Sequence, residues 1–360
     1  MKQKRTFLHA LIAVLLASTG MLFCDSWGTN MHRGANTGLW LSAGDLTVLR
    51  SWGADHVRAQ LLKANVPLTP ASDEKEATFT DKGWAGLEKF LAAAREAKLK
   101  VVIDLHQYES FFPGEWDTNA MNALNDPKRV GKLCAIWKTI AARYKDDRDL
   151  IIGYDIMNEP HPPYTPEGYD AWNTIAAKVV EAIRSVDTHH TVIIECGSYG
   201  NPGAMSSLKP VKDANTVYSF HMYSPHEFAE QGTRPQWPKG QPYPGMVGIG
   251  WDMKTPTMID KNYMIAQYKP VRDFQLAHNA RIWVGEFNAI RSAPDGSAYR
   301  YLADCLELYE AYGWSWAYHA FRESSAWDLE LSDTDIADKK RHASTQRLDL
   351  MKQYLRKNVK

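Results

Sequence analysis

Two stretches of the chain decide its fold: Ile151-Ile-Gly-Tyr-Asp-Ile-Met-Asn-Glu-Pro160 and Arg281-Ile-Trp-Val-Gly-Glu-Phe-Asn288. Each is an apolar run typical of a buried parallel strand, and each leads to a carboxylate, Glu159 in the first and Glu286 in the second. In an α/β barrel the catalytic groups lie at the carboxyl ends of the strands. The two stretches therefore predict a barrel with a pair of glutamates at its catalytic mouth.

The rest of the chain repeats the same alternation of apolar runs and amphipathic segments. We predict strands over 30–36, 56–60, 99–106, 151–158, 191–196, 216–221, 282–286 and 315–319, and helices that include 84–97, 129–144, 169–186, 262–278 and 298–312. Alternating strands and helices favour a parallel sheet, and eight such repeats describe a (β/α)8 TIM barrel of the α/β class. With no internal repeat or linker in the sequence, we expect one domain.

Two connections after strands, 107–127 after the third and 224–257 after the sixth, are too long for plain loops. Long connections without clear secondary structure are usually functional. The second is rich in proline, glycine and aromatic residues, including Trp237, Tyr243 and Trp251. We therefore predict that both loops lie at the mouth and that these aromatic side chains form cleft walls.

The overall charge argues against one class of partner. The chain has 42 basic and 42 acidic residues, and this balance does not favour nucleic acid, which needs a clustered basic face. The 13 Trp and 17 Tyr suit both an ordinary core and flat platforms for sugar rings. We expect a monomer.

The amino terminus has the pattern of a targeting segment. A basic stretch, Met1-Lys-Gln-Lys-Arg5, precedes an apolar stretch over 7–17 that is short for a spanning helix. We predict a secretory signal or an N-terminal anchor over 1–23 and the catalytic domain over 24–360. The mature protein is then expected to be secreted or periplasmic and to have no integral membrane span, and Cys24 leaves lipid modification as a third alternative.

The remaining cysteines, Cys134, Cys196 and Cys305, are far apart and lack metal-like spacing. One disulfide in an oxidising compartment is compatible with the sequence, which does not select the pair. We predict no metal and no cofactor. A metal-dependent hydrolase would need a ligand cluster such as His-x-His at a strand end, and His189-His190 instead precedes a strand.

Two carboxyl groups at the mouth suggest the acid/base and the nucleophile of a glycosidase. Asn158, next to Glu159, suits the hydrogen bond to the sugar 2-hydroxyl that tightens in the transition state. Asn158-Glu159-Pro160 and Gly285-Glu286-Phe287, in this order at the fourth and seventh strands, resemble the acid/base and nucleophile motifs of glycoside hydrolase family 5. The resemblance covers essentially the whole mature chain and implies a retaining enzyme, with Glu159 as acid/base and Glu286 as nucleophile.

Further positions carry the same resemblance. His32-Arg33-Gly34-Ala35-Asn36 resembles the first-strand signature. Arg58 resembles the arginine that keeps the nucleophile ionised, and His106 the third-strand histidine that helps hold the substrate or the Asn158 region. In the sixth strand, Tyr223 would orient the nucleophile and His221 would tune the acid/base.

The eighth strand departs from the family pattern, which commonly ends on a tryptophan under the sugar at the catalytic position. Here His319 stands at that place. Either His319 itself stacks or hydrogen-bonds, or Trp327 in the following loop reaches in, or Trp316 takes the part. We favour the first two, because strand alternation points Trp316 outward if His319 points inward.

The family resemblance implies a β-1,4-linked polysaccharide as substrate, and we expect an endo-β-1,4-glucanase acting on soluble or amorphous glucan. A β-mannanase and an exo-acting β-glucan hydrolase are alternatives, because glucose and mannose differ only at the 2-hydroxyl and a long loop could close the cleft. A non-catalytic sugar-binding barrel is a further alternative. It would predict loss of a carboxylate or of its supporting residues, yet Glu159, Glu286, Arg58 and Tyr223 are all present.

Overall fold

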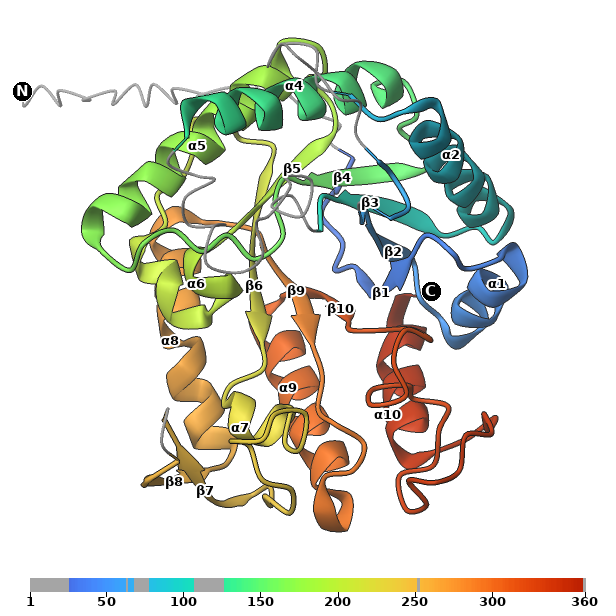
Figure 1. Cartoon of the computed structure of the whole chain (residues 1–360), viewed down its shortest axis with the longest axis vertical. Helices are drawn as coiled ribbons and strands as arrows, with labels where there is room; N and C mark the ends of the chain where they lie inside the picture. The colour runs from blue at the N-terminus through green and yellow to red at the C-terminus, as the bar shows by residue number, and fades with distance from the viewer. Residues whose placement is uncertain (1–25, 63, 68–77, 107–125, 251–252, 359–360) are drawn as a thin grey trace, which may run out of the picture.

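The computed structural model describes residues 26–62, 64–67, 78–106, 126–250 and 253–358. Its centre is a closed barrel of eight parallel strands, in which the last strand pairs with the first (Figure 1). The strands, in their order around the barrel, are β1 (Arg33–Gly38), β2 (His56–Gln60), β3 (Lys100–Asp104), β4 (Ile151–Asp155), β5 (Thr191–Glu195), β6 (Thr216–Met222), β9 (Ile282–Phe287) and β10 (Ser315–Tyr318). The predicted (β/α)8 fold is confirmed.

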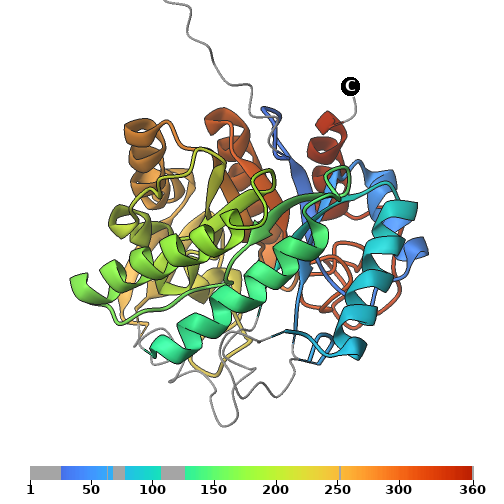
Figure 2. The same ribbon diagram turned by 90° about the horizontal axis from the view of Figure 1, so that it is seen from above.

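Helices surround the barrel, as Figure 2 shows from a second direction. The longer ones are α1 (Ala43–Trp52), α2 (Asp81–Glu96), α4 (Pro127–Tyr144), α5 (Pro166–Arg184), α8 (Lys261–His278), α9 (Ser297–Tyr312) and α10 (Gln346–Leu355). Most begin at a polar side chain that accepts a hydrogen bond from a free backbone N–H of the first turn, as Thr165 does for Gly168. The helix starts are therefore encoded locally.

Alternation along each strand divides the apolar side chains between two cores. In β3, Val101 and Ile103 belong to the large core between strands and helices, whereas Val102 belongs to a small cluster inside the barrel. The inner cluster contains one residue from most strands, and Trp27 and Trp283 pack edge to face within it. Side chains therefore fill the interior of the barrel at the level of this inner cluster.

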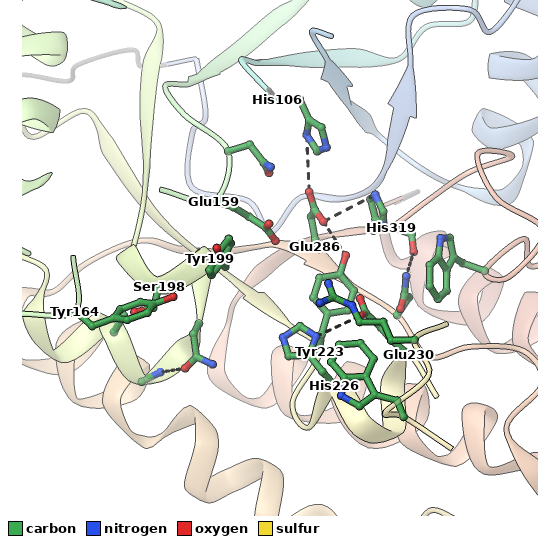
Figure 3. A pocket seen from close by; sticks show the side chains of 18 of the residues that line it. His106, Glu159, Tyr164, Ser198, Tyr199, Tyr223, His226, Glu230, Glu286 and His319 are labelled. Atoms are coloured by element: carbon green, nitrogen blue, oxygen red, sulfur yellow. Dashed lines mark hydrogen bonds and ion pairs between the residues drawn. The ribbon is translucent and has the colours of Figure 1, made fainter. Parts of the chain in front are cut away.

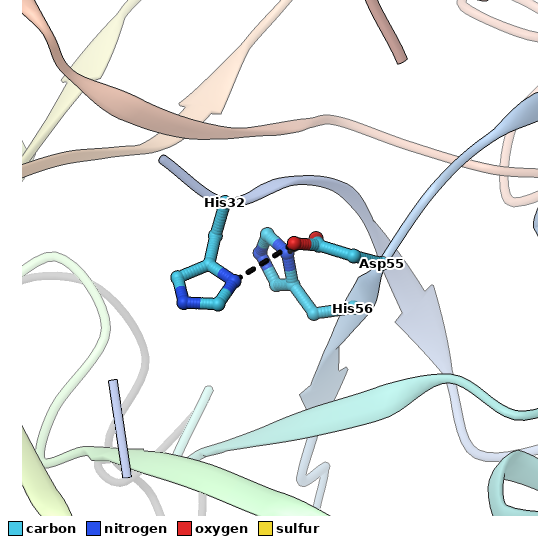
Figure 4. Close-up of side chains that lie close together, drawn as sticks. All are labelled: His32, Asp55 and His56. Carbon is cyan, nitrogen blue, oxygen red and sulfur yellow. Dashed lines mark hydrogen bonds and ion pairs between the residues drawn. The ribbon is translucent and has the colours of Figure 1, made fainter. Parts of the chain in front are cut away.

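Hydrogen-bonded polar groups close the amino-terminal end of the barrel (Figure 4). The Asp55 carboxylate lies 2.8 Å from His32 Nδ1 and 2.7 Å from His56 Nδ1, and His32 Nε2 donates to the Trp27 carbonyl. Burial would raise the pKa of Asp55, but its hydrogen bonds from the two histidines hold it well below its usual range. With this end closed, the carboxyl ends of the strands form the accessible mouth.

The loop predicted over 224–257 has more structure than the sequence suggested. It contains the short helix α7 (His226–Ala229) and a two-stranded antiparallel sheet of β7 (Gly245–Ile249) and the start of β8 (Thr255–Ile259). Residues 107–125 of the other long loop lie outside the described residues. The prediction that a long loop lies at the mouth can therefore be compared with the structure only for 224–257.

Among the described residues, Cys134, Cys196 and Cys305 are free thiols. The described helices include none with the length and apolar character that a membrane span requires. The segment 1–23 and Cys24, on which the targeting prediction rests, lie outside the described residues.

Candidate active site

A cleft of about 1080 Å³ lies at the mouth of the barrel (Figure 3). Most of the side chains predicted from the sequence line it. These are His106, Asn158, Glu159, Tyr223, Glu286, His319 and Trp327. The other two, Arg58 and His221, are buried beside them and contact the glutamates directly.

Glu286 projects from β9 and is almost completely buried, with 5% of its side chain exposed. Arg58 Nη1 donates to one carboxylate oxygen at 2.6 Å, and the Tyr223 hydroxyl donates to the other at 2.7 Å. Burial alone would raise the pKa of this carboxyl. The charges of His319, His221, Arg58 and His106 outweigh burial and hold the pKa well below its usual range. Glu286 is therefore an ionised carboxylate held in a fixed orientation.

Arg58 anchors the floor of the cleft. Its guanidinium is fully buried and donates to Asp155 at 2.8 Å and Glu195 at 2.9 Å, besides Glu286. It also donates to the side-chain oxygens of Asn36 and Asn158. Burial would lower the pKa of Arg58, but the surrounding carboxylates raise it well above its usual range. The arginine thus links the strand ends β1, β2, β4, β5 and β9 in one network.

Glu159 lies four residues beyond the end of β4 and has a left-handed backbone with φ of 47°. This conformation is uncommon for a residue with a side chain. The Glu159 N–H donates to Glu195 Oε2 at 2.8 Å, which holds the turn. One carboxylate oxygen of Glu159 and one of Glu286 lie within 4.8 Å of each other. The turn therefore brings the two carboxyl groups face to face.

His221, on β6, lies between Glu159 and Glu195 and contacts both carboxylates. Its Nδ1 lies 3.0 Å from Glu159 Oε1 and its Nε2 lies 3.1 Å from Glu195 Oε1. Burial would lower the pKa of His221, but Glu195, Glu286 and the hydrogen bonds to both carboxylates raise it well above its usual range. The ring is therefore a cation that donates from both nitrogens.

His106 lies just beyond β3, where its Nδ1 is 2.7 Å from Asp104 Oδ2 and 4.0 Å from Glu286. Burial would lower the pKa of His106, and the Asp104 carboxylate raises it. Asp104 also lies 3.1 Å from Arg58. His106 therefore lines the cleft with its ring fixed by the carboxylate beneath it.

The end of the eighth barrel strand matches the predicted alternation. His319 and Trp327 line the cleft, whereas Trp316 is fully buried in the core between strands and helices, against Phe287. His319 and Trp327 are thus the two side chains of this chain that can take the place of the tryptophan common in glycoside hydrolase family 5. His319 is the one that lies directly at the strand end.

Of the aromatic residues predicted to form cleft walls in the second mouth loop, Trp237 lines the cleft and Tyr243 does not. Trp237 lines the cleft and stacks on His226, with an angle of 17° between the rings. The prediction that Tyr243 forms a cleft wall is wrong. Its ring is buried against Phe228 and Tyr301, and its hydroxyl donates to Asp304 on α9. Trp251 lies outside the described residues.

Several contributors were missed by the sequence reasoning. Glu195, Asp104 and Asp155 each end an apolar strand on a carboxylate, the same signal that singled out Glu159 and Glu286, and all three contact Arg58. Tyr164 and Tyr199 also line the cleft, and no local pattern distinguishes them from other surface tyrosines. From the first-strand signature, Asn36 reaches the network, whereas Arg33 pairs with Glu310 away from the cleft.

Among the residues that the structure describes, two groups of side chains have atoms close enough to surround a metal ion: Glu159 with His221 and Glu286 in the cleft, and His32 with Asp55 and His56 at the opposite end. In both groups the facing nitrogen and oxygen atoms include pairs at ordinary hydrogen-bond distance. The cleft group has two carboxylates and one cationic histidine, and a protonated ring nitrogen is not a metal ligand. Its donor set therefore suits proton transfer better than metal binding.

Comparisons with known proteins agree with this geometry. A family model described as cellulase (glycosyl hydrolase family 5) matches residues 23–325. Endoglucanase C of Acetivibrio thermocellus is 24% identical over 323 residues, which cover 84% of this chain and 88% of the relative.

Two solved structures have the same fold. Thermotoga maritima Cel5A in complex with cellobiose superposes with a TM-score of 0.71 at 24% identity, over 91% of this chain and all of the other. The same T. maritima protein in complex with mannotriose gives a TM-score of 0.70 at 23% identity, with the same coverage. At these identities the structural likeness establishes the fold alone.

Proposed function

The chain belongs to the cellulase family of glycoside hydrolases, family 5, and we propose that it is a retaining endo-β-1,4-glucanase. The observation that carries the proposal is that one carboxylate oxygen of Glu159 and one of Glu286 lie within 4.8 Å of each other. Retaining glycosidases hold their carboxyl groups about 5–5.5 Å apart, whereas inverting ones need about 6.5–9.5 Å to admit a water molecule. The separation of Glu159 and Glu286 supports retention.

In the first step the Glu286 carboxylate attacks the anomeric carbon. The bond from that carbon to the glycosidic oxygen breaks, and Glu159 donates its proton to the departing oxygen. The products are a glycosyl ester on Glu286, an ionised Glu159 and a free chain end. The depressed pKa of Glu286 supports its role as the attacking group.

In the second step Glu159 acts as the base. It takes a proton from water, the water oxygen attacks the anomeric carbon, and the ester bond breaks to restore the Glu286 carboxylate. His221 donates to Glu159 Oε1 and holds this carboxyl in place through both steps. Two inversions at the same carbon give overall retention.

Asn158 is arranged for the sugar 2-hydroxyl. Its side-chain oxygen accepts from Arg58 at 2.9 Å, which directs the amide N–H groups away from the arginine, and Asn158 lines the cleft. An N–H donor there can hold the 2-hydroxyl oxygen and orient the hydroxyl group, whose own proton becomes a stronger donor as positive charge develops on the ring. This supports the role proposed for Asn158 in the transition state.

The shape of the cleft supports internal cleavage. Its described walls extend to both sides of the glutamate pair, toward Tyr164 and Tyr199 in one direction and toward His319 in the other (Figure 3). Aromatic rings on both sides can stack on successive sugars of a chain. The relative named endoglucanase C supports a β-1,4-glucan substrate. The mannotriose complex of the T. maritima protein keeps β-mannan as the second candidate.

Secretion is part of the proposal. Its support is the basic and apolar pattern of residues 1–17 together with a polymeric substrate, which cannot enter a cell. Fractionation of cells that express the full chain tests it, with mature protein expected in the medium or periplasm.

The activity test is reducing-sugar release from soluble cellulose, glucomannan and pure mannan. The wild-type protein should release sugar from cellulose and not from pure mannan, and Glu286→Ala should lower the rate by about a thousandfold or more. The matched control is Glu307→Ala, an exposed glutamate on α9, which should keep full activity. Preference for mannan would overturn the assignment of glucan as the substrate, and early release of cellobiose alone would favour exo action. A Glu286→Ala protein that stays active would overturn the assignment of Glu286 as the nucleophile.

A further inference from the structure

His319 lies in the cleft, and no step of the proposed mechanism involves a contact between His319 and the sugar. Its side chain is 14% exposed, and its Nε2 lies 3.9 Å from Glu286 Oε2 and 3.7 Å from Glu323 Oε2. The Asn288 amide donates to the His319 carbonyl at 2.7 Å and fixes the backbone (Figure 3). Glu323 also lines the cleft. The ring nitrogen therefore points into the space beside the nucleophile with a second carboxylate close by.

The surroundings of the ring determine which nitrogen carries the proton. His319 Nδ1 is buried and has no hydrogen-bond partner among the described residues. A buried N–H without an acceptor is rarer in proteins than a buried acceptor without a donor. A neutral ring therefore favours a bare Nδ1 and an N–H at Nε2, and a charged ring carries the same N–H at Nε2. This N–H is a donor directed into the cleft.

The donor and the Glu323 carboxylate are too far apart for a direct hydrogen bond, which would need about 2.7–3.2 Å. A separation of 3.7 Å instead leaves both groups able to contact one oxygen placed beside them. A hydroxyl group both accepts and donates. His319 can donate to its oxygen while Glu323 accepts its proton, so the pair can bind one hydroxyl both as an acceptor and as a donor.

The strand order indicates which hydroxyl this is. Asn158 follows β4 and His319 follows β10, and these strands are directly opposite each other in the eight-stranded barrel. If Asn158 holds the 2-hydroxyl, the opposite edge of the sugar ring faces His319. The atom opposite C2 in a pyranose ring is C5, which carries a hydroxymethyl group in hexoses and only hydrogen in pentoses.

We propose that His319 and Glu323 bind the C6 hydroxyl of the sugar at the catalytic position and thereby select hexosides over pentosides. The proposal rests on the proposed function, since it places the sugar by the roles of Asn158 and Glu286. The pair does not distinguish glucosides from mannosides, which differ at C2. A tryptophan at this position would offer a flat apolar face in place of the donor and acceptor.

The test compares two substrates that differ in this one hydroxyl. They are 4-nitrophenyl β-cellobioside and its analogue with a 6-deoxy sugar next to the nitrophenol. For the wild-type protein we expect kcat/KM to fall by about tenfold to a hundredfold for the 6-deoxy analogue, since the site would be left with unpaired polar groups. Binding of both compounds to Glu286→Gln, measured by calorimetry, should show the same preference.

Three variants separate recognition from a structural role. Glu323→Ala should lower kcat/KM for the parent compound and bring the two substrates to within about threefold of each other, because the acceptor is gone. Glu323→Gln retains an acceptor oxygen and should restore part of the preference. Glu307→Ala, an exposed glutamate on α9, should leave the preference unchanged. A purely structural role would lower both rates equally.

Each outcome decides the question. Equal rates for both substrates in the wild-type protein, or an unchanged preference in Glu323→Ala, would overturn the proposal. If neither compound is turned over but Glu286→Gln binds the parent more tightly, the hydroxyl site stands and the proposed function fails. Equal binding of both compounds, or no binding of either, would overturn the site.

Discussion

Replacing Tyr223 by phenylalanine tests how the protein keeps its nucleophile ionised. The change removes one hydroxyl that donates to Glu286 Oε2 at 2.7 Å, and it keeps the buried ring. A donor to a carboxylate favours the ionised form. Its loss raises the pKa of Glu286, so the acid limb of kcat/KM should move to higher pH.

The contacts that remain set the size of the effect. A hydrogen bond to a charged group contributes about 1.5–3 kcal/mol, and about 1.4 kcal/mol corresponds to one pH unit. Glu286 keeps its 2.6 Å bond from Arg58, and a water molecule can enter part of the space left by the hydroxyl. We therefore expect the lower end of this range, an acid limb displaced upward by about one pH unit.

The assay is kcat/KM on 4-nitrophenyl β-cellobioside across the acid limb, because this quantity reports the ionisation of the free enzyme. The same carboxyl adds folding stability that is present above its unfolded pKa and lost as the pH falls through its folded pKa. The variant should thus lose stability at a higher pH on acidification. Tyr268→Phe is the control, since its hydroxyl bonds Tyr309 away from the cleft. A folded Tyr223→Phe protein with the acid limb of the wild type would refute the reasoning.

Two further changes test the network and the cleft wall. Arg58→Met leaves several buried carboxylates without their cation and should cost about 3–5 kcal/mol of unfolding free energy in urea, whereas the exposed Arg95→Met should cost under about 1 kcal/mol. A loss below 1 kcal/mol for Arg58→Met would contradict the buried network. Trp237→Ala removes a ring from the cleft and should raise KM for cellohexaose about threefold to tenfold with little change in kcat, as stacking contributes about 0.5–1.5 kcal/mol. An unchanged KM would mean that no sugar rests on this wall.

The sequence alone predicted the barrel because its signals are local. Strand and helix periodicity can be read over a few residues, and the apolar runs that lead to Glu159 and Glu286 mark positions at one end of a parallel sheet. The same signal was available for Glu195, Asp104 and Asp155. These carboxylates could have been predicted to lie at the mouth, although not to share one arginine.

Other features depend on contacts between distant segments. Tyr243 and Trp237 belong to the same aromatic loop, yet Tyr243 is buried because Phe228, Tyr301 and Asp304 form a pocket for it. Nothing within the loop sequence distinguishes the two rings.

The sequence by itself determined which side chains stand at the strand ends, and so which chemistry reaches the mouth. Only the tertiary structure decided how far apart they lie. The approach of Glu159 to Glu286 within 4.8 Å depends on barrel closure and on the left-handed turn at Glu159 that Glu195 holds. The gap between His319 and Glu323 depends in the same way on the fold of the loop after β10. Periodicity fixes the face on which a residue lies, whereas a distance across the barrel is set by the packing of all eight strands.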